Sequence, residues 1–444
     1  MDDEWHDPDE WVSDSSRALM RVMREILNAG GCANPIHLQS MAVDRSTGEL
    51  TLGNIRIACK DRRRVVCPAC SARYKADAWF LATSGLLGGK GLSSEVAHHP
   101  RLFATLTAPS FGSVHTITDD GHCRPRRTPP CEHGEDTSCT RRHEDDDEML
   151  GTPLCARCFD YDGAVVWNAM ASKLWHRTVD RLRRRLAASQ DLSAAEFRSV
   201  AQINQLRVAE TQRRGLVHLH AIVRGDGPEG PETEPPEWLT TQVLMTEFRR
   251  AVGSVSMAVP DGSTVRWGAQ LDVTEIPSDD EAGRAAGYIA KYATKTTDGT
   301  LALSSPFRTR QGIEHARISP HLRRLVLAAW DLDDRPKMGG LRLREHAHAL
   351  GFAGHLITKS QRYSTTFGAL RAARAAFLVD GFDAEVVDDR VLMFGYLGRG
   401  YSDHRGEELA EGFTDWVEGI RKEQRLKRLA KVLSDEEGGD TEGP

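Results

Sequence analysis

Residues 215–223, Gly-Leu-Val-His-Leu-His-Ala-Ile-Val, constrain the fold of this chain more than any other segment. Their alternation predicts a strand with His218 and His220 on one face and Val217 and Leu219 on the other. The apolar face can pack on helices. The other face offers two neutral nitrogen ligands at a fixed separation, which suits a divalent metal ion with open coordination positions. A His-x-His pair is often incidental, so this interpretation needs support from elsewhere in the chain.

A second segment, residues 287–295, is predicted to be helical and has the sequence Gly-Tyr-Ile-Ala-Lys-Tyr-Ala-Thr-Lys. A spacing of four residues places Tyr288 with Tyr292, and Lys291 with Lys295, on one side of a helix. A tyrosine hydroxyl can attack phosphorus to form a covalent ester with nucleic acid, and a lysine can neutralise the phosphate. The alternative is an amphipathic helix with packed aromatic rings and solvated lysines.

A third segment, residues 103–109, has the sequence Phe-Ala-Thr-Leu-Thr-Ala-Pro and is predicted to be an alternating strand closed by proline. The chain thus resembles the HUH endonucleases of rolling-circle replication, whose motifs are Phe-x-Thr-Leu-Thr, His-hydrophobic-His and Tyr-x-x-Lys in this order. It is most similar in these motifs to the replication initiators of actinobacterial plasmids and integrative elements. The resemblance covers most of residues 30–375.

This resemblance implies a protein that nicks one DNA strand at a plasmid origin, forming a 5′-phosphotyrosine link and a 3′-hydroxyl primer. It also implies that His218 and His220 hold Mg²⁺ or Mn²⁺. Such sites usually take a third polar ligand, and we expect Glu210, with Gln212 on the same face as the alternative. An ion pair with a nearby arginine is the other interpretation of Glu210.

The resemblance also assigns roles to the tyrosine helix. Tyr292 is the expected nucleophile, because the second aromatic position of this motif aligns with the nucleophile of a larger plasmid group. Tyr288 is the second candidate, since enzymes with two tyrosines can alternate the hydroxyls to nick and then rejoin a strand. Lys291 and Lys295 are expected to position the phosphate.

The nine cysteines are expected to bind zinc rather than form disulfides, as is usual in a cytosolic chain. They fall into two groups, each with one Cys-x-x-Cys pair and two further thiols, the number that a tetrahedral structural zinc needs. Cys123 is left over, and His133 or His143 can replace a thiol in the second group. The alternatives are free buried thiols or one site that joins both Cys-x-x-Cys pairs. The first group is Cys32, Cys59, Cys67 and Cys70, and the second is Cys131, Cys139, Cys155 and Cys158.

The formal net charge of −6 does not exclude DNA binding, because charge is unevenly distributed along the chain. The sequence contains no apolar run of about eighteen residues and no basic, apolar leader, so we expect a soluble cytoplasmic protein without a membrane partner. Acidic residues concentrate in 1–10, 144–148, 226–237 and 435–442, and basic residues in 181–185, 207–214 and 335–374.

At 444 residues the chain is too long for one ordinary core. The expected fold class is α+β, with an HUH-type catalytic domain built on a central antiparallel sheet with flanking helices, zinc-binding modules and a mainly helical C-terminal region. The expected divisions are a disordered acidic N-terminus (1–15), an N-terminal zinc-binding module (16–100), the HUH endonuclease domain (101–300) with a zinc-binding insert (121–162), a helical C-terminal DNA-binding or accessory region (301–431) and a disordered acidic tail (432–444).

Two other functions compete with replication initiation. A conjugative relaxase or mobilisation protein performs the same transesterification, but its tyrosine generally precedes the histidine motif. A non-catalytic, zinc-dependent DNA-binding regulator would need neither the tyrosines nor the histidines. The sequence has no ATPase motif, so a host helicase and DNA polymerase are expected partners besides the origin and its single-stranded nick site. Lys359, Arg362 and Tyr363 lie in a polar segment that either contacts DNA or forms a capped interdomain turn.

Overall fold

The computed structural model describes residues 14–117, 122–124, 129–277, 279–295, 305–379, 390–401, 406, 408–410, 412, 415–416 and 419. The chain forms two compact units, the first comprising residues 1–75 and 375–444 and the second residues 76–374. The first unit therefore combines segments from both ends of the chain, whereas the sequence predicts separate regions for them. The predicted disordered ends, 1–15 and 432–444, lie outside the described residues except for positions 14 and 15.

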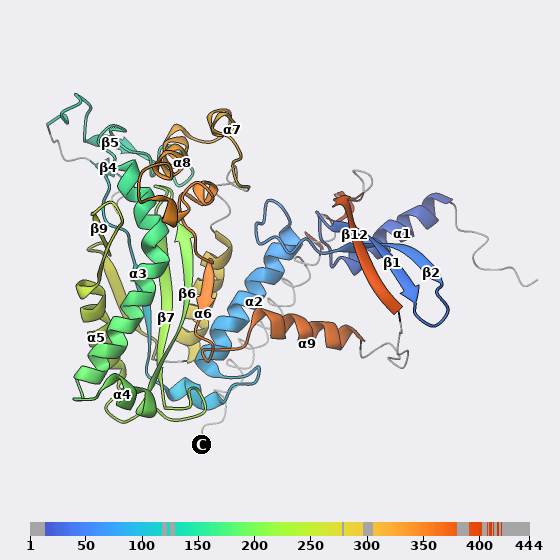
Figure 1. Ribbon diagram of the computed structural model, residues 1–444, viewed down its shortest axis with the longest axis horizontal. Helices are drawn as coiled ribbons and strands as arrows, with labels where there is room; N and C mark the ends of the chain where they lie inside the picture. Colours follow the sequence, from blue (N-terminus) through green and yellow to red (C-terminus); the bar gives the residue numbers. More distant parts are fainter. Residues whose placement is uncertain are drawn as a thin grey trace, which may run out of the picture. The chain divides into compact units, whose positions relative to one another are not determined.

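A five-stranded antiparallel sheet forms the centre of the second unit (Figure 1). Its middle strand is β7, which is hydrogen-bonded to β3 on one side and to β6 on the other. The predicted α+β class with an antiparallel sheet is thus confirmed. The strands in spatial order are β10 (Leu271–Glu275), β3 (Arg101–Leu106), β7 (Val217–Asp226), β6 (Gln202–Thr211) and β11 (Ile357–Lys359).

The strands β6 and β7 form a hairpin, and residues 212–216 connect them. Gly215 in this turn has a φ of +79°, a left-handed conformation that glycine adopts without a steric penalty. The register of the hairpin places Glu210 directly opposite His218. Because directly paired residues of an antiparallel sheet project to the same side, these two side chains share one face.

Two helices, α3 (Tyr161–Ala188) and α5 (Thr241–Ser254), belong to the apolar core on one face of the sheet. The carboxylate of Asp160 caps α3 by accepting a hydrogen bond from the backbone of Gly163 at 2.8 Å. The indole of Trp175 on α3 is fully buried. The sheet residues in the same buried cluster are Leu102, Ala104, Leu106, Leu219, Ala221 and Val223.

The helix α6 (Asp279–Lys295) lies on the opposite face, where its tyrosine rings meet the ring of His220. Its buried side chains recur at the spacing of an amphipathic helix, which explains why this segment is helical and which side faces the sheet. These buried residues are Ala282, Ala286, Ile289, Ala290 and Ala293.

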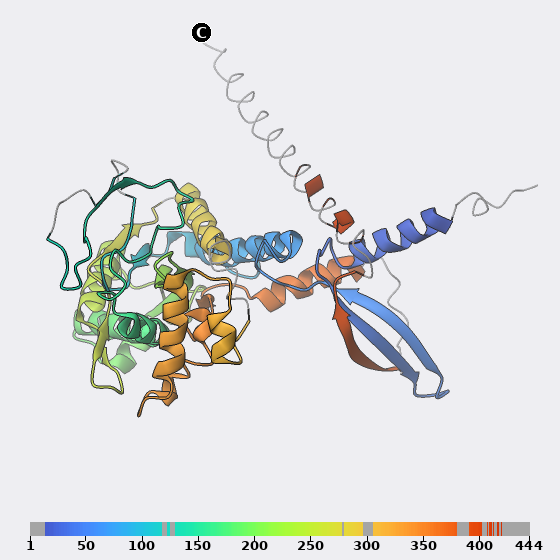
Figure 2. The ribbon, with the colours of Figure 1, turned by 90° about the horizontal axis from the view of Figure 1, so that it is seen from above.

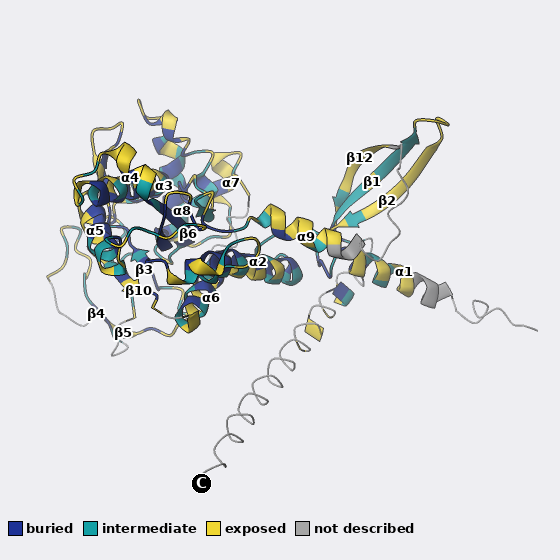
Figure 3. Ribbon diagram, turned by 90° about the horizontal axis from the view of Figure 1, so that it is seen from below, coloured by how far each residue is buried: buried dark blue, intermediate teal, exposed yellow. Residues whose placement is uncertain are grey.

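The described part of the first unit contains a second antiparallel sheet, in which β1 (Ile36–Asp44) lies between β12 (Arg390–Arg399) and β2 (Leu50–Ile57) (Figure 2). The helix α1 (Asp14–Asn28) precedes this sheet. β12 comes from the region that the sequence analysis expected to be mainly helical. Large apolar side chains on its outer strands are exposed, and Leu52 is 60% exposed. Figure 3 shows most of β2 in the colour of exposed residues.

Shorter elements complete the fold. The helix α2 begins at Pro68, because proline is favoured in a first helical turn, where its missing N–H costs no hydrogen bond. The remaining elements are α2 (Pro68–Leu87), η2 (Ser94–His98), β4 (His122–Arg124), β5 (Cys139–Arg142), α4 (Ala194–Val200), β8 (Ser256–Ala258), β9 (Thr264–Arg266), α7 (Arg310–Glu314), α8 (Pro320–Leu332), η4 (Gly339–Leu341), η5 (Ala347–Ala349) and α9 (Phe367–Val379).

Candidate active site and metal clusters

The two histidines of β7 project onto the face that α6 covers. Their ring centroids are 4.7 Å apart. His220 is 1% exposed, whereas His218 is only partly buried. Leu219, between them on the strand, is fully buried on the opposite face. Apolar packing on one side of β7 therefore fixes the backbone that holds both imidazoles on the other side.

Glu210 completes a cluster with these histidines. Its Oε2 lies 3.3 Å from Nε2 of His220, and the ligand atoms of all three residues lie within 4.8 Å of one another. Glu210 is 8% exposed, so its carboxylate is held away from bulk water. Two imidazoles and one carboxylate on adjacent strands can bind a divalent metal ion and leave coordination positions for a substrate.

Neighbouring polar groups orient both imidazoles. The Thr105 hydroxyl lies 3.2 Å from Nδ1 of His220, and the side-chain amide of Gln212 lies 2.8 Å from Nδ1 of His218. Gln212 in turn accepts a hydrogen bond from Nε of Arg214 at 2.9 Å. Such contacts fix the rotation of metal-binding rings. Gln212, the alternative third ligand in the sequence analysis, thus contacts a histidine, and Glu210 lies in the cluster itself.

The predicted tyrosine pair lies directly over this cluster. The ring centroid of Tyr292 is 4.2 Å from that of His220, and the ring centroid of Tyr288 is 5.2 Å from it. The Tyr292 hydroxyl donates a hydrogen bond to the Tyr288 hydroxyl at 3.0 Å. Phe103 packs edge-on against Tyr288, with 5.4 Å between ring centroids. The three sequence motifs, far apart in the chain, therefore meet at one place.

Lys291 and Lys295 are the two lysines of the tyrosine motif. Lys291 is exposed, and its Nζ lies 5.9 Å from the centroid of the Tyr292 ring. Its ammonium is therefore close enough to the hydroxyl pair to attract an anionic ligand. The side chain of Lys295 lies outside the described residues.

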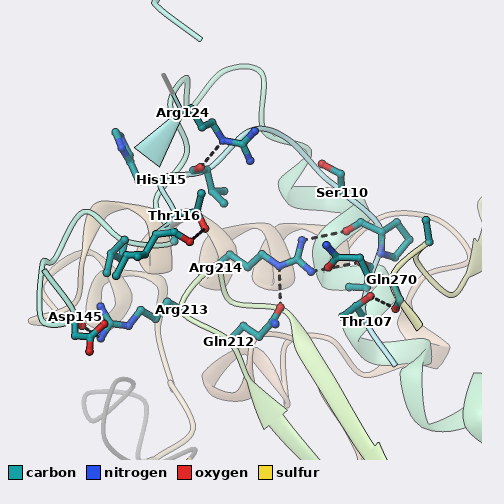
Figure 4. A pocket seen from close by; sticks show the side chains of 17 residues that line it. Thr107, Ser110, His115, Thr116, Arg124, Asp145, Gln212, Arg213, Arg214 and Gln270 are labelled. Carbon is teal, nitrogen blue, oxygen red and sulfur yellow. Dashed lines mark hydrogen bonds between the residues drawn. The ribbon is translucent and has the colours of Figure 1, made fainter. Parts of the chain in front are cut away.

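A cavity of about 870 Å³ lies where β3 ends and the β6–β7 turn begins (Figure 4). The Arg214 guanidinium reaches across it to the backbone oxygens of Ala108 and Pro109, at 3.3 and 3.4 Å. Burial lowers the pKa of Arg214. The cavity is polar and partly cationic, which suits an anionic ligand. Its polar lining residues are Thr107, Ser110, His115, Thr116, Arg124, Asp145, Gln212, Arg213, Arg214 and Gln270.

The structure brings together the first predicted cysteine group, which lies in the first unit. Cys32, Cys59, Cys67 and Cys70 place their sulfur atoms within 4.8 Å of one another, with 3.7 Å between those of Cys32 and Cys67. Cys32 follows the end of α1, and Cys59 follows β2. Cys67 immediately precedes α2, and Cys70 lies in its first turn. Backbone N–H groups donate to the sulfur atoms of Cys32 and Cys67, at 3.2 and 3.4 Å. Four converging thiols can bind a tetrahedral zinc ion.

The structure groups the second set of cysteines differently from the sequence analysis. Cys131, Cys155 and Cys158 lie with His133, whose Nδ1 is 3.1 Å from the sulfur of Cys158. Cys139 is absent from this cluster.

Cys139 instead lies with Cys123, His115 and His143 in another cluster. The pairing of β4 with β5 explains this position. Cys139 lies opposite Arg124 in the ladder, next to Cys123. His115 was not singled out from the sequence. The Cys-x-x-x-His spacing of Cys139 and His143 was a visible signal, since zinc ligands commonly recur three to five residues apart.

The ring of Tyr363 is part of the interior, so of the two predicted alternatives for its segment, contact with DNA does not apply to this ring. Tyr363 is fully buried, and its hydroxyl donates to the backbone oxygen of Ala82 at 3.3 Å. A Cβ on Gly85 would lie 2.3 Å from this ring, so glycine makes room for it. Lys359 donates to backbone oxygens, including that of Ser364 at 2.7 Å. These residues therefore form a capped turn within the second unit.

Fold and site together define a class: an α+β protein with antiparallel sheets and several side-chain clusters that can bind metal ions. Within the residues that the structure describes, no helix is both long and apolar enough to cross a membrane. The family model described as "Replication initiator protein, pSAM2" (RepSA) matches residues 18–415. The chain belongs to this family of plasmid replication initiators.

A relative of the chain supports this membership. A replication initiator protein of Streptomyces ambofaciens is 40% identical over 412 residues, which cover 85% of this chain and 86% of the relative. No solved structure matches the chain. The predicted relationship to replication initiators is thereby confirmed, while the HUH subclass stays a prediction.

Proposed function

We propose that this protein nicks one DNA strand at a plasmid origin by tyrosine transesterification, in the manner of an HUH endonuclease. The main support is the position of the Tyr292 ring, 4.2 Å from the His220 ring in a cluster suited to a divalent metal ion. A nucleophile and the metal ion that activates the phosphate must both contact the same phosphate group. The Tyr292 ring and the His220 cluster are close enough for this. Family membership supplies the substrate class, origin DNA.

His218, His220 and Glu210 are the proposed ligands of Mg²⁺ or Mn²⁺. The bound ion would polarise the scissile phosphate and stabilise the charge that develops on it. Thr105 and Gln212 would act on the histidines by holding their rings. Lys291 and Lys295 would neutralise the flanking phosphate.

The proposed reaction exchanges one phosphoester for another. The Tyr292 oxygen forms a bond to phosphorus while the bond from phosphorus to the 3′ oxygen breaks. The Tyr292 hydroxyl, which is hydrogen-bonded to the Tyr288 oxygen, gives up its proton to solvent as the bond to phosphorus forms. The departing 3′ oxygen takes up a proton from solvent. The products are a 5′-phosphotyrosine and a 3′-hydroxyl that a host polymerase would extend behind a host helicase.

Structural zinc is the proposed occupant of two of the cysteine clusters, the one formed by Cys32, Cys59, Cys67 and Cys70 and the one formed by Cys131, His133, Cys155 and Cys158. Four protein ligands saturate a tetrahedral ion, which leaves no position for substrate. Their role would therefore be to hold the fold.

The test is incubation of the purified chain with a labelled supercoiled plasmid that carries the cognate origin. We expect a metal-dependent covalent protein–DNA band that disappears in Tyr292→Phe, which removes the attacking oxygen and keeps the ring. His218→Ala and His220→Ala should abolish nicking and leave duplex binding largely intact, because phosphate contacts elsewhere supply most of the affinity.

The rival functions predict other outcomes. Origin binding without any covalent adduct would favour the non-catalytic regulator. Cleavage confined to the transfer origin of a mobilisable plasmid would favour the relaxase. Undiminished nicking by the double histidine variant would refute the metal assignment.

A further inference from the structure

The cluster of His115, Cys123, Cys139 and His143 is used neither by the proposed DNA chemistry nor by the two proposed zinc sites. It lies in the segment between β3 and α3. The ligand atoms of the four residues lie within 4.8 Å of one another. All four residues are between 1% and 9% exposed, so the cluster is an interior feature of this segment.

We propose that this cluster is a further structural zinc site, with two thiolates and two imidazoles as ligands. Tetrahedral zinc, with Zn–S of about 2.3 Å and Zn–N of about 2.0 Å, places neighbouring ligand atoms roughly 3.4–3.8 Å apart. The sulfur of Cys139 is 3.7 Å from Nε2 of His143, and the sulfur of Cys123 is 3.6 Å from Nδ1 of His115. Both distances match edges of that tetrahedron. Binding converts two thiols to thiolates and releases their two protons to solvent.

The groups around the cluster favour the metal-bound form. Nδ1 of His143 lies 2.6 Å from Oδ2 of Asp147 and donates to it, so Nε2 carries the lone pair that points towards the cluster. A carboxylate behind a histidine in this way fixes its tautomer and strengthens it as a ligand. The backbone N–H of Thr116 donates to the sulfur of Cys123 at 3.3 Å, which stabilises a thiolate.

The loop that follows the cluster touches the hairpin turn of the active site. Arg213 in this turn donates to the backbone oxygen of Asp147 at 3.3 Å and also to that of Asp145, which lies beside it (Figure 4). Gly151 at the end of the loop has a φ of +81°, and a Cβ there would lie 2.5 Å from the carbonyl carbon of Arg213. The two backbones are therefore in direct contact.

A zinc ion in the cluster would therefore hold residues 143–151 against residues 212–215. Gln212 in that turn is hydrogen-bonded to His218 at 2.8 Å. The zinc site thus positions a residue that orients a candidate metal ligand of the active site. This last step rests on the proposed role of His218, whereas the zinc site itself does not.

Elemental analysis of the full chain tests the site directly. We expect three zinc ions per chain and two in Cys139→Ser. Cys67→Ser, a matched change in the first unit, should also lose one ion. Two ions in the unchanged chain, an unchanged count in Cys139→Ser, or a disulfide between Cys123 and Cys139 found by mass spectrometry would overturn the proposal.

Asp147→Asn keeps all four ligands and tests the site where Cys139→Ser fails to fold. Losing an outer-shell partner of this kind weakens metal binding by about 10–100-fold, measurable by competition with a chromophoric chelator. Asp145→Asn is the control, since its backbone oxygen, not its carboxylate, accepts from Arg213.

Hydrogen exchange at residues 212–215 should rise in Cys139→Ser and stay unchanged in Cys67→Ser. Unchanged affinity in Asp147→Asn, or equal exchange in both cysteine variants, would contradict the proposal. These measurements involve no DNA cleavage, so a negative result would refute the zinc site without bearing on the proposed nicking function.

Discussion

The two units of this initiator have interiors of different kinds. The second unit encloses its sheet in a large apolar core that includes Trp167, Trp175 and Phe248. In the described part of the first unit, the buried cluster consists of alanines and cysteines around Cys32 and Cys67. Apolar burial contributes about 25 cal/mol for each Å² removed from water, so small side chains supply little of it. We infer that the sheet of the second unit is stabilised by its apolar core, whereas the described part of the first unit depends on its proposed zinc site.

Removal of zinc should produce the largest difference in stability between the two units. Zinc supplies on the order of 10 kcal/mol in small zinc modules, so chelation should unfold β1 and β2 while residues 219–224 of β7 keep their protection. Hydrogen exchange of the full chain with and without a strong chelator measures both regions in one experiment. Equal loss of protection in β1 and β7 would show that the central sheet of the second unit also depends on metal.

Asp226→Asn should cause the next largest effect, in the second unit alone. Its carboxylate accepts hydrogen bonds from Arg224 at 2.6 and 2.9 Å and from Asn204 at 2.7 Å, and lies 2.7 Å from His99. Removing one charge of a buried ion pair costs about 3–5 kcal/mol. Chemical denaturation at pH 7 measures this loss, with the exposed Asp272→Asn as a control that should stay within about 0.5 kcal/mol.

The same carboxylate predicts a pH dependence. Burial raises the pKa of Asp226, but the hydrogen bonds from His99, Arg224 and Asn204 outweigh burial and leave the pKa below its ordinary value. A carboxylate with a lowered pKa stabilises the fold fully above the ordinary pKa of about 4 and loses this contribution as the pH falls further. The difference between wild type and Asp226→Asn should therefore shrink below about pH 4. A stability difference that increases as the pH falls would contradict the predicted direction.

A leucine-to-alanine change in a strand of each unit compares the two interiors directly. Leu219→Ala in β7 should cost about 2–5 kcal/mol, because the side chain is fully buried in the apolar core. Leu52→Ala in β2 should change stability by no more than about 0.5 kcal/mol, because that side chain is 60% exposed. Equal losses of stability in the two variants would mean that the side chain of Leu52 is buried against another surface in solution.

The smallest effect is expected from Tyr288→Phe. This change removes the hydroxyl that accepts from Tyr292 and keeps the ring that packs on Phe103. One hydrogen bond is worth about 1 kcal/mol, so the first cleavage should slow by less than about tenfold. Strand rejoining should suffer more, because the second positioned hydroxyl is missing. Mapping the phosphotyrosine by peptide mass spectrometry decides the assignment, since an adduct on Tyr288 alone would reverse it.

Much of the fold near the site could be predicted because its signals are local. The strand in residues 215–223 and the helix in residues 287–295 follow from side-chain periodicity. The pairing of β1 with β12, which places Ile36 opposite Arg399, could not be predicted, because no local pattern links segments so distant in sequence.

The same limit applies to the candidate site. The two histidines and two tyrosines could be found because fixed spacings place each pair on one face of an element. The placement of Cys139 beside Cys123 depends on the pairing of β4 with β5. The burial of Tyr363 depends on a glycine in α2, at position 85. Both positions depend on contacts between segments distant in sequence, so the local sequence does not predict them.

The position of β7 in the middle of its sheet has a consequence for how the site can change. A strand hydrogen-bonded on both sides opens only when two ladders break, so its side chains undergo little local unfolding. The imidazoles are therefore arranged during folding, and the proposed divalent ion would meet preorganised ligands. The tyrosines belong to a separate helix, α6, that lies over these imidazoles. In the proposed reaction, substitutions in α6 would therefore alter which hydroxyl acts, or when, without disturbing the proposed metal ligands.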